Sequence, residues 1–392
     1  MQSENNRHCE PRRGEAISKM VTEIASSGKA LLAMTGLICL LISSCGSITP
    51  TPIVEITETP STELTPVDLQ TGYGVKGSWF ELYFTDPVDP FSSQGTGGVD
   101  VPLVAAIDAA RLSIDVAAYS LTLNSVRNAL LNAHDRGVTI RMVMESTNMD
   151  SSDVERLLEA GISIVGDKQD GLMHDKFMVI DKSEVWLGTM NFTDSGAYDD
   201  DNTLMRILST KMAENYSKEF DEMFLDNRFG ENVTPETPHP TLTIDSTRVD
   251  TFFSPDDGVQ SQIATVLSGA EESIYFLAFS FTSNDLGDIV REKAEDGLTV
   301  RGVMDEEQIA SNQGTEFDPF RQAGIDVRID GIEGQMHHKI FIIDESIVVV
   351  GSYNFSQSAE TRNDENILII YNEAIAQQFM MEFERVWKVA HE

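Results

Sequence analysis

Hydrophobic positions after residue 110 alternate between short apolar runs and stretches with helical spacing. Two apolar runs predict strands at 112–119 and 138–145, and the stretch between them has a helical period and ends at Gly137. The same order recurs further along, with strands at 273–280 and 299–305 and a helix that ends near Gly297. Each copy closes with a strand (204–208; 367–371) and an amphipathic helix (212–225; 374–389). This alternation predicts an α/β fold with covered sheets.

The two copies are an internal repeat about 160 residues apart. Residues 174–192 match residues 337–355 at nine of nineteen positions without a gap. We therefore expect two similar α/β lobes related by a pseudo-two-fold axis, each with a mixed sheet flanked by helices. Such symmetry brings equivalent strand ends together, so the repeated residues should converge on one cleft.

The first 45 residues have the pattern of an export signal. A mostly apolar stretch of about thirteen residues, 30–42, is too short to span a bilayer and is followed by Ser43, Ser44 and Cys45. This end resembles a bacterial lipobox, which implies lipid attachment at Cys45 and anchoring to the extracytoplasmic face of a membrane. An ordinary signal peptide is the alternative, and the long leader leaves Met20 as a second candidate start.

Composition suggests how the rest of the chain is divided. Residues 46–72 are rich in Thr and Pro without a helical or strand period, and a second proline-rich stretch begins at Gly230. The predicted order is a signal peptide with lipobox (1–45), a disordered tether (46–72), a first lobe (73–229), a linker (230–247) and a second lobe (248–392).

Charge and cysteine content narrow the chemistry. The chain has 28 basic and 64 acidic side chains, a formal net charge of −36, and 60 of the acidic ones follow Cys45. Nucleic-acid binding through the overall field is therefore disfavoured. All three cysteines precede residue 46, so neither a disulfide framework nor a cysteine zinc site is expected in the folded part.

Both copies contain the same motif. A Lys lies two positions after a His, an Asp five positions after the Lys, a Gly seven positions after the Asp, and an Asn three positions after the Gly. The positions are His174, Lys176, Asp181, Gly188 and Asn191 in the first copy and His337, Lys339, Asp344, Gly351 and Asn354 in the second. On a strand, His and Lys share one face while Asp points to the other. We expect each Asp to fix the strand end and its turn as part of the structural motif, together with the glycine.

Two histidines, two lysines and two asparagines gathered in one cleft suit a phosphodiester. The lysines and amides neutralise and hold the non-bridging oxygens. One imidazole can attack phosphorus while the other protonates the leaving oxygen, and the second can then activate water against the phosphohistidine. No metal and no cofactor are expected, because the lysines already supply the positive charge.

Carboxylates are expected to orient the two rings. The candidates are Asp201 and Glu365, which each precede an asparagine and a strand. When Asn202 is matched with Asn366, the first copy has one residue fewer in this segment. Asp200 and Asp199 are therefore alternatives to Asp201 as the orienting carboxylate. His338 lies on the face of the strand opposite His337, so its predicted role is structural.

The doubled motif resembles the phospholipase D superfamily, over about residues 78–387. The resemblance implies that His174 is the nucleophile and His337 the general acid and base. It also implies that Lys176, Lys339, Asn191 and Asn354 bind phosphate and that Glu365 and Asp201 orient the rings. Thr189 replaces the serine that is common in the family, whereas Ser352 keeps it.

The reaction is better defined than the substrate. The acidic chain and the expected membrane anchor favour a phospholipase D type hydrolase that acts on phospholipid head groups and releases phosphatidic acid and an alcohol. A secreted endonuclease of the same superfamily and a phosphatidyltransferase resembling cardiolipin synthase are alternatives. A further alternative, from a different functional class, is a non-catalytic, membrane-anchored binding module that retains the fold. The sequence indicates no protein partner.

Overall fold

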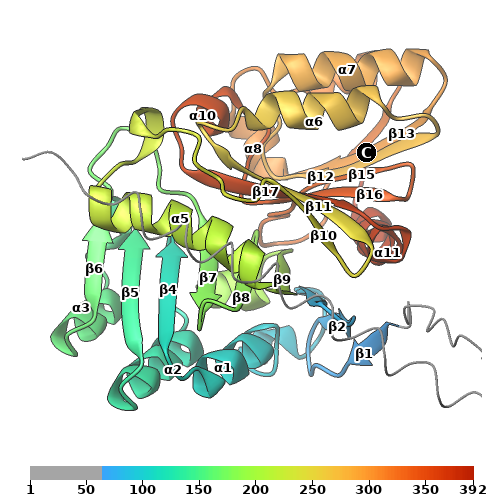
Figure 1. Cartoon of the computed structure of the whole chain (residues 1–392). Coiled ribbons are helices and arrows are strands. Elements are labelled where there is room, and N and C mark those ends of the chain that lie inside the picture. The colour runs from blue at the N-terminus through green and yellow to red at the C-terminus, as the bar shows by residue number, and fades with distance from the viewer. Residues whose placement is uncertain (1–63) are drawn as a thin grey trace, which may run out of the picture. The chain divides into compact units, whose positions relative to one another are not determined.

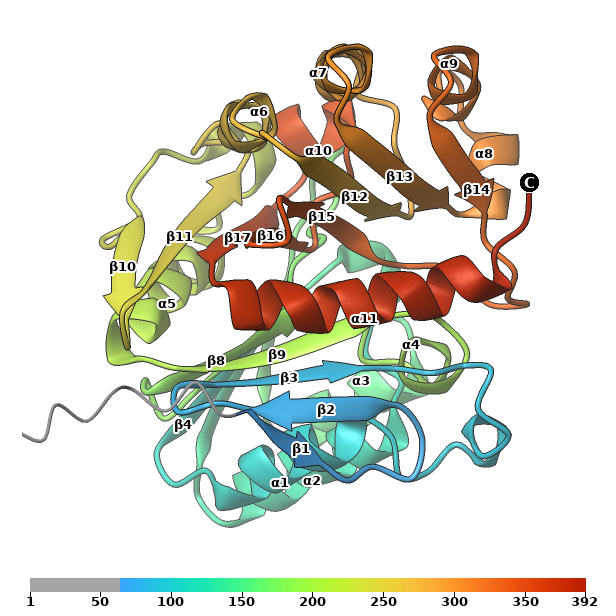
Figure 2. The ribbon, with the colours of Figure 1, turned by 90° about the vertical axis from the view of Figure 1, so that its right-hand side faces the viewer.

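The structure is a computed structural model and describes residues 64–392. The predicted signal peptide, the lipid-attachment residue Cys45 and most of the predicted tether lie outside the described residues. The described residues all belong to one compact unit. Figure 1 shows the two sheets and their helices, and Figure 2 shows the same ribbon from the side.

The first lobe is built on a nine-stranded mixed sheet with the order β1-β2-β3-β9-β8-β7-β4-β5-β6. Its strands are β1 (Thr65–Val67), β2 (Tyr73–Lys76), β3 (Phe80–Phe84), β4 (Ser113–Ala118), β5 (Thr139–Met144), β6 (Ser163–Gly166), β7 (Lys176–Ile180), β8 (Glu184–Gly188) and β9 (Thr203–Leu208). The pairs β4–β5 and β5–β6 are parallel, and the other pairs are antiparallel.

The second lobe repeats this arrangement in an eight-stranded sheet with the order β10-β11-β17-β16-β15-β12-β13-β14. Its strands are β10 (Thr241–Ile244), β11 (Thr247–Ser254), β12 (Ser273–Ala278), β13 (Thr299–Met304), β14 (Asp326–Ile329), β15 (Lys339–Ile343), β16 (Ile347–Gly351) and β17 (Glu365–Tyr371). The two lobes with mixed sheets flanked by helices confirm the predicted fold class.

Two long helices lie between the sheets. Helix α5 (Thr210–Asp226) packs on β4, β5, β7 and β8, and α11 (Glu373–Val389) packs on the equivalent strands β12, β13, β15 and β16. Figure 2 shows α11 running between the two sheets. The central core combines apolar side chains from both helices and both sheets, so the two lobes share one hydrophobic interior.

The remaining helices cover the outer faces and connect the strands. In the first lobe they are η1 (Ser92–Gln94), α1 (Asp100–Ala109), α2 (Asn124–Asp135), η2 (Ser146–Asn148), α3 (Ser152–Glu159), α4 (Asp194–Tyr198) and η3 (Gly230–Asn232). In the second they are α6 (Val259–Ser268), α7 (Asn284–Glu295), α8 (Glu306–Ser311), α9 (Phe317–Gln322) and α10 (Gln357–Thr361). Each outer layer forms a separate apolar core with its sheet.

Burial on both faces explains the sequences of the central strands. All five residues of β7 and of β15 are buried, and both strands consist of apolar residues after their initial lysine. Ser209 and Asn372 cap the amino ends of α5 and α11 by accepting backbone N–H groups three residues later.

Two predicted irregular segments contain strands. Residues 65–67, assigned to the tether, pair with β2 as the sheet edge, and residues 241–244, assigned to the linker, pair with β11. The threonines and prolines in and around these segments led to the prediction of irregular structure, but both segments form short edge strands by pairing with a neighbouring strand. Within residues 64–392, no helix has the length and apolar character needed to cross a bilayer.

Candidate active site between the lobes

The repeated histidines and lysines lie at the start of two central strands. Lys176 and Lys339 begin β7 and β15, and each histidine lies two residues earlier. His174 is 7% exposed and His337 is 3% exposed, while both lysines are 1% exposed. All four side chains therefore lie in a largely water-excluded region, where electrostatic interactions are strong.

Backbone pairing across the lobes brings the two motifs together. The His174 N–H donates to the Asp364 carbonyl, and the His337 N–H donates to the Asp201 carbonyl. Each motif strand thus forms a short parallel bridge with the other lobe, Met173 with Asp364 and Met336 with Asp201. The pseudo-symmetric bridges place each histidine against the other lobe.

Glu365 contacts the ring of His174, where the sequence predicted an orienting carboxylate. His174 Nδ1 lies 2.7 Å from Glu365 Oε2, and Glu365 is fully buried. Burial disfavours ionisation of Glu365, but the His174 ring and Lys176 outweigh it and hold the Glu365 pKa below its usual value. The ring therefore donates from Nδ1 and has Nε2 available for the substrate.

The ring of His337 contacts an amide instead of a carboxylate. His337 Nδ1 lies 2.9 Å from Asn202 Oδ1, while Asn202 Nδ2 donates to the Gly196 carbonyl. Thr189 Oγ1 donates to the same Asn202 oxygen at 2.8 Å. These contacts fix the amide orientation, so His337 also donates from Nδ1, and no residue within 64–392 forms a hydrogen bond with its Nε2.

The prediction that Asp201 orients a ring is wrong. The Asp201 side chain pairs with Arg385 of α11, away from His337. The paired strands show the reason. Gly188 lies opposite Leu204 and Gly351 opposite Ile367, so Asn202 is the equivalent of Glu365. No residue is missing from the first copy, and neither Asp200 nor Asp199 takes the role. Aligning the strand partners instead of the asparagines would have identified Asn202.

Burial makes the two rings difficult to protonate. It lowers the pKa of His174, an effect that Glu365 opposes and Lys176 and Lys339 reinforce. It lowers the pKa of His337 further, because Lys339, Lys176 and the His174 ring add to burial without a neighbouring carboxylate. The two rings therefore have unequal environments.

The lysines have equivalent positions. Lys176 Nζ donates to the His174 carbonyl at 2.6 Å, and Lys339 Nζ donates to the His337 carbonyl at 2.7 Å. Burial lowers the pKa of Lys176 to about 8, against the opposing effect of Glu365 and Asp175. Burial and the charge of Lys176 lower the pKa of Lys339 well below its usual value. A bound phosphate anion would favour the charged forms.

The two motif asparagines keep unused hydrogen-bonding capacity. The side-chain oxygens of Asn191 and Asn354 are buried without a partner among the described residues. Each asparagine follows the glycine that ends β8 or β16. A Cβ at Gly188 or Gly351 would lie about 2 Å from a carbonyl oxygen of the neighbouring strand, so only glycine permits this approach.

The motif aspartates anchor turns away from the reacting groups. Asp181 accepts the backbone N–H groups of residues 111–113, and Asp344 accepts those of residues 271–273. Each carboxylate thus fixes the start of a neighbouring strand, β4 or β12.

The residue between each His and Lys faces the central helices. His338 is fully buried, with Nδ1 3.0 Å from Thr203 Oγ1 and Nε2 2.8 Å from Glu382 of α11. Its equivalent, Asp175, accepts a hydrogen bond from Asn366. These contacts agree with a structural role for His338.

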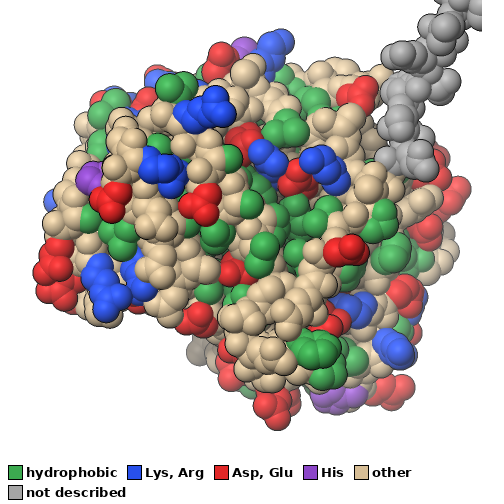
Figure 3. Space-filling model, turned by 90° about the horizontal axis from the view of Figure 1, so that it is seen from below, with side chains coloured by type: hydrophobic (Ala, Val, Ile, Leu, Met, Phe, Trp, Pro, Cys, Tyr) green, Lys and Arg blue, Asp and Glu red, His purple; other side chains and the backbone are tan. Residues whose placement is uncertain are grey.

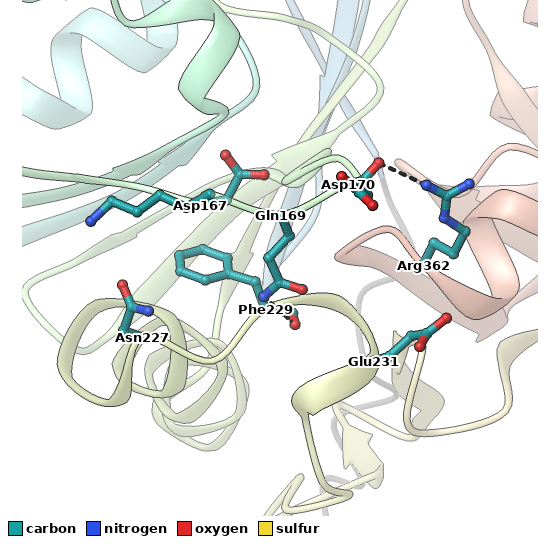
Figure 4. A pocket seen from close by; sticks show the side chains of 9 residues that line it. Asp167, Gln169, Asp170, Asn227, Phe229, Glu231 and Arg362 are labelled. Atoms are coloured by element: carbon teal, nitrogen blue, oxygen red, sulfur yellow. Dashed lines mark hydrogen bonds between the residues drawn. The ribbon is translucent and has the colours of Figure 1, made fainter.

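A cavity of about 650 Å³ lies beside the loop that leads to His174. Lys168, Asp170, Glu231 and Arg362 line it with other polar groups, and Arg362 donates to the Asp170 carbonyl (Figure 4). The backbone segments 170–174 and 362–365 run side by side from this cavity to the His174–Glu365 pair. The cavity therefore adjoins the site without containing its histidines.

Comparisons with known proteins agree with this geometry. A family model described as "Cardiolipin synthase, PLD-like domain" matches residues 103–224 and 263–387. A mitochondrial cardiolipin hydrolase from Chlamydomonas reinhardtii is 35% identical over 127 residues, which are 32% of this chain and 56% of that protein. A phospholipase D from Rickettsia conorii is 32% identical over 133 residues, 34% of this chain and 66% of that protein.

The fold is shared over a longer stretch with a solved structure. The phosphatidylserine synthase of Haemophilus influenzae superposes with a TM-score of 0.61 at 13% identity, covering 79% of this chain and 86% of that one. The curated relatives are matched over about half to two thirds of their own length. Because the family model matches both lobes, including both histidine–lysine pairs, the chain belongs to the phospholipase D superfamily, in the family of cardiolipin synthase, PLD-like domains.

Proposed function

We propose that this protein hydrolyses the head-group phosphodiester of a phospholipid through a covalent phosphohistidine. One observation carries the proposal: two buried imidazoles, one from each lobe, donate from Nδ1 and lie beside two buried lysines, and neither Nε2 is hydrogen-bonded to a described residue. A phosphodiester matches these groups, because it needs a nucleophile, a proton donor and positive charge around its non-bridging oxygens.

In the first step, His174 Nε2 attacks phosphorus and the bond to the leaving alcohol oxygen breaks. His337 Nε2–H gives its proton to that oxygen, so a neutral alcohol leaves. Lys176, Lys339 and the two motif asparagines hold the non-bridging oxygens as their charge grows. The negative charge of the bound diester favours the protonated form of His337 that this step requires.

In the second step, His337 Nε2, now neutral, takes a proton from water as the water oxygen attacks phosphorus. The bond from phosphorus to His174 Nε2 breaks, and phosphatidic acid is released. His337 keeps the proton for the next cycle, so the ring states are restored.

The carboxylate and the amide support this division of roles. A nucleophilic imidazole becomes positively charged when its Nε2 bonds to phosphorus, and the Glu365 carboxylate next to His174 stabilises that charge. Asn202 adds no charge to His337, so the imidazolium of His337 is a stronger acid and gives up its proton readily. The pseudo-symmetric site is thereby made directional.

The charge of the chain supports a lipid substrate over a polynucleotide. Acidic side chains outnumber basic ones by 64 to 28. On the face seen from below, Lys and Arg side chains are interspersed with Asp and Glu and form no continuous track (Figure 3). A nuclease needs a row of cations that follows the phosphate backbone. The relatives named above, a cardiolipin hydrolase and a phospholipase D, also favour a lipid.

The test compares substrates under one condition. The purified chain is incubated with EDTA and with phosphatidylcholine vesicles, cardiolipin vesicles or plasmid DNA. We expect phosphatidic acid and a free head group from a lipid, without nicking of the plasmid. Nicking without lipid turnover would replace the proposal with the endonuclease. An added alcohol that is captured in preference to water would instead indicate a phosphatidyltransferase.

We also propose that the protein is exported and anchored at a membrane surface through Cys45. The proposal rests on the apolar stretch 30–42 and the Ser43-Ser44-Cys45 sequence that follows it. Metabolic labelling with palmitate tests it. The wild-type chain should incorporate label and fractionate with membranes, and Cys45→Ala should do neither.

A further inference from the structure

Two aromatic rings occupy equivalent positions in the site and are not part of the repeated His–Lys–Asp–Gly–Asn spacing. Tyr119 directly follows β4 and Phe279 directly follows β12, each one residue beyond the strand that pairs with the histidine–lysine strand. Both rings are half-buried. Their backbones are tied to the motif, because Tyr119 N–H donates to the Asp175 carbonyl and Phe279 N–H to the His338 carbonyl.

Each ring contacts both functional side chains of its own half-site. The Tyr119 ring lies 5.0 Å from the His174 ring, at an interplanar angle of 70°, and 5.0 Å from Lys176 Nζ. The Phe279 ring lies 4.7 Å from the His337 ring, at 67°, and 4.5 Å from Lys339 Nζ. The contacts are thus repeated across the pseudo-two-fold axis by two different aromatic residue types.

Each ring acts on both the lysine ammonium and the histidine imidazole that it contacts. The face of an aromatic ring attracts an ammonium ion, and the attraction strengthens when water is excluded. The edge-on contact restricts rotation of the imidazole about its side-chain bonds, which keeps Nε2 directed at the substrate. A residue that held only one of the two groups would leave their separation free to vary.

We propose that Tyr119 and Phe279 are positioning residues, which hold the histidine and the ammonium of each half-site at a fixed separation and stabilise the charged lysine. The role rests on the ring face, because Tyr and Phe fill equivalent positions and the contacts are the same. The mechanistic part of this inference rests on the proposed function, whereas the effect on the lysines does not.

Lys339 is the more sensitive of the two ammonium groups. It lies near one cation, Lys176, and near the carboxylates of Glu365, Asp305 and Asp200, while burial disfavours its charge. Among the described residues, Lys339 Nζ contacts the His337 carbonyl directly and lies over the face of the Phe279 ring. Loss of the ring face should therefore lower the Lys339 pKa.

The test measures that pKa directly in the full chain, labelled with [ε-¹³C]lysine and titrated by NMR. In Phe279→Leu we expect the Lys339 pKa to fall by about one unit, a tenfold change in its proton affinity. In Phe279→Tyr, which keeps the ring, it should stay at the wild-type value. Tyr119→Leu should lower the pKa of Lys176 in the same way.

Phe320 supplies the matched control. It is a buried phenylalanine of the same lobe, and its ring also lies near a cation, 5.7 Å from the Arg291 guanidinium. Within residues 64–392 its aromatic neighbours are Phe276 and Phe281, and it contacts neither His337 nor Lys339. Phe320→Leu should lower the unfolding temperature without moving the Lys339 pKa. Thermal unfolding of every variant separates loss of the fold from loss of the contact.

The second measurement is the rate of turnover and its dependence on pH. Phe279→Leu should lower kcat/KM about tenfold and move the alkaline limb of the pH profile to lower pH, and Phe279→Tyr should restore both. An unchanged Lys339 pKa in folded Phe279→Leu, or an equal loss in Phe279→Tyr, would overturn the inference. Failure of the wild type to cleave any diester would overturn the proposed function while leaving the NMR result to decide the role of the rings.

Discussion

His174 Nδ1 lies 2.7 Å from the Glu365 carboxylate, a contact that joins the two lobes through residues 191 positions apart. The equivalent ring, His337, meets an amide at nearly the same distance. A structure that is symmetric in its backbone is therefore asymmetric in charge at its centre. The proposed division of labour between the two histidines rests on this single difference.

Removing the carboxylate next to His174 should slow the reaction. In Glu365→Gln the ring keeps a hydrogen-bond acceptor but loses the negative charge that stabilises its phosphorylated form. We expect kcat to fall about 10–100-fold. Measurement of kcat with far-ultraviolet circular dichroism as a check on folding tests this. Unchanged kcat in a folded variant would contradict the assignment of His174 as nucleophile.

Adding a carboxylate next to His337 should have a different effect. Burial and the nearby lysines lower the His337 pKa, and Asn202→Asp would place a negative charge close to Nδ1. Because a carboxylate favours the imidazolium, the His337 pKa should rise, and the pH limb that reports its protonated form should move to higher pH. Histidine ¹⁵N NMR of the same variant gives the pKa independently. A limb that stays in place would show that His337 is not the general acid.

Stability should depend on pH through Asp175. Burial raises the pKa of Asp175 to about 7 from 3.8, so the folded chain favours its neutral form. The stability that this form contributes is complete below pH 3.8 and is lost as the pH rises through 7. Asp175→Asn should therefore stabilise the chain more at pH 8 than at pH 5, by about 2–3 kcal/mol. Urea unfolding at both values checks this, and an equal change at both would contradict it.

Arg385 should be essential for the contact between α11 and the first lobe. Its guanidinium pairs with Glu382, Asp201 and Asp86, and the first two are fully buried. Arg385→Met would leave two buried carboxylates without their cation and should lower the free energy of unfolding by about 3–5 kcal/mol. Lys388→Met, at an exposed position of the same helix, is the control and should change it by less than about 0.5 kcal/mol.

The repeat in the sequence was enough to predict the two lobes and their convergence. Apolar runs and glycine-terminated helices are local signals, and the central strands follow them closely. The edge strands β1 and β10 lack such a signal, because their residues become strands only through pairing with β2 and β11. A Thr/Pro composition therefore indicated irregular structure where short strands form.

The residues on the two motif strands could be predicted because their spacing is local. The partners of the rings could not be, because each comes from the other lobe and depends on strand register. Matching Asn202 with Asn366 shifted the comparison by one residue and selected Asp201, whereas the paired glycines Gly188 and Gly351 place Asn202 opposite His337. The sequence gives Tyr119 and Phe279 no signal of a role beside the motif, because aromatic residues at strand ends are usually part of a core.

The most direct test of the account is a burst experiment with His337→Asn and a p-nitrophenyl phosphodiester, whose leaving group departs without a proton donor. We expect a burst of about one p-nitrophenolate per chain, followed by slow turnover, because the second step still needs a base. Mass spectrometry after an alkaline quench should find the phosphoryl adduct on His174, and His174→Asn should give no burst. An adduct on His337 in the wild-type chain, or an equal burst in His174→Asn, would contradict the central claim.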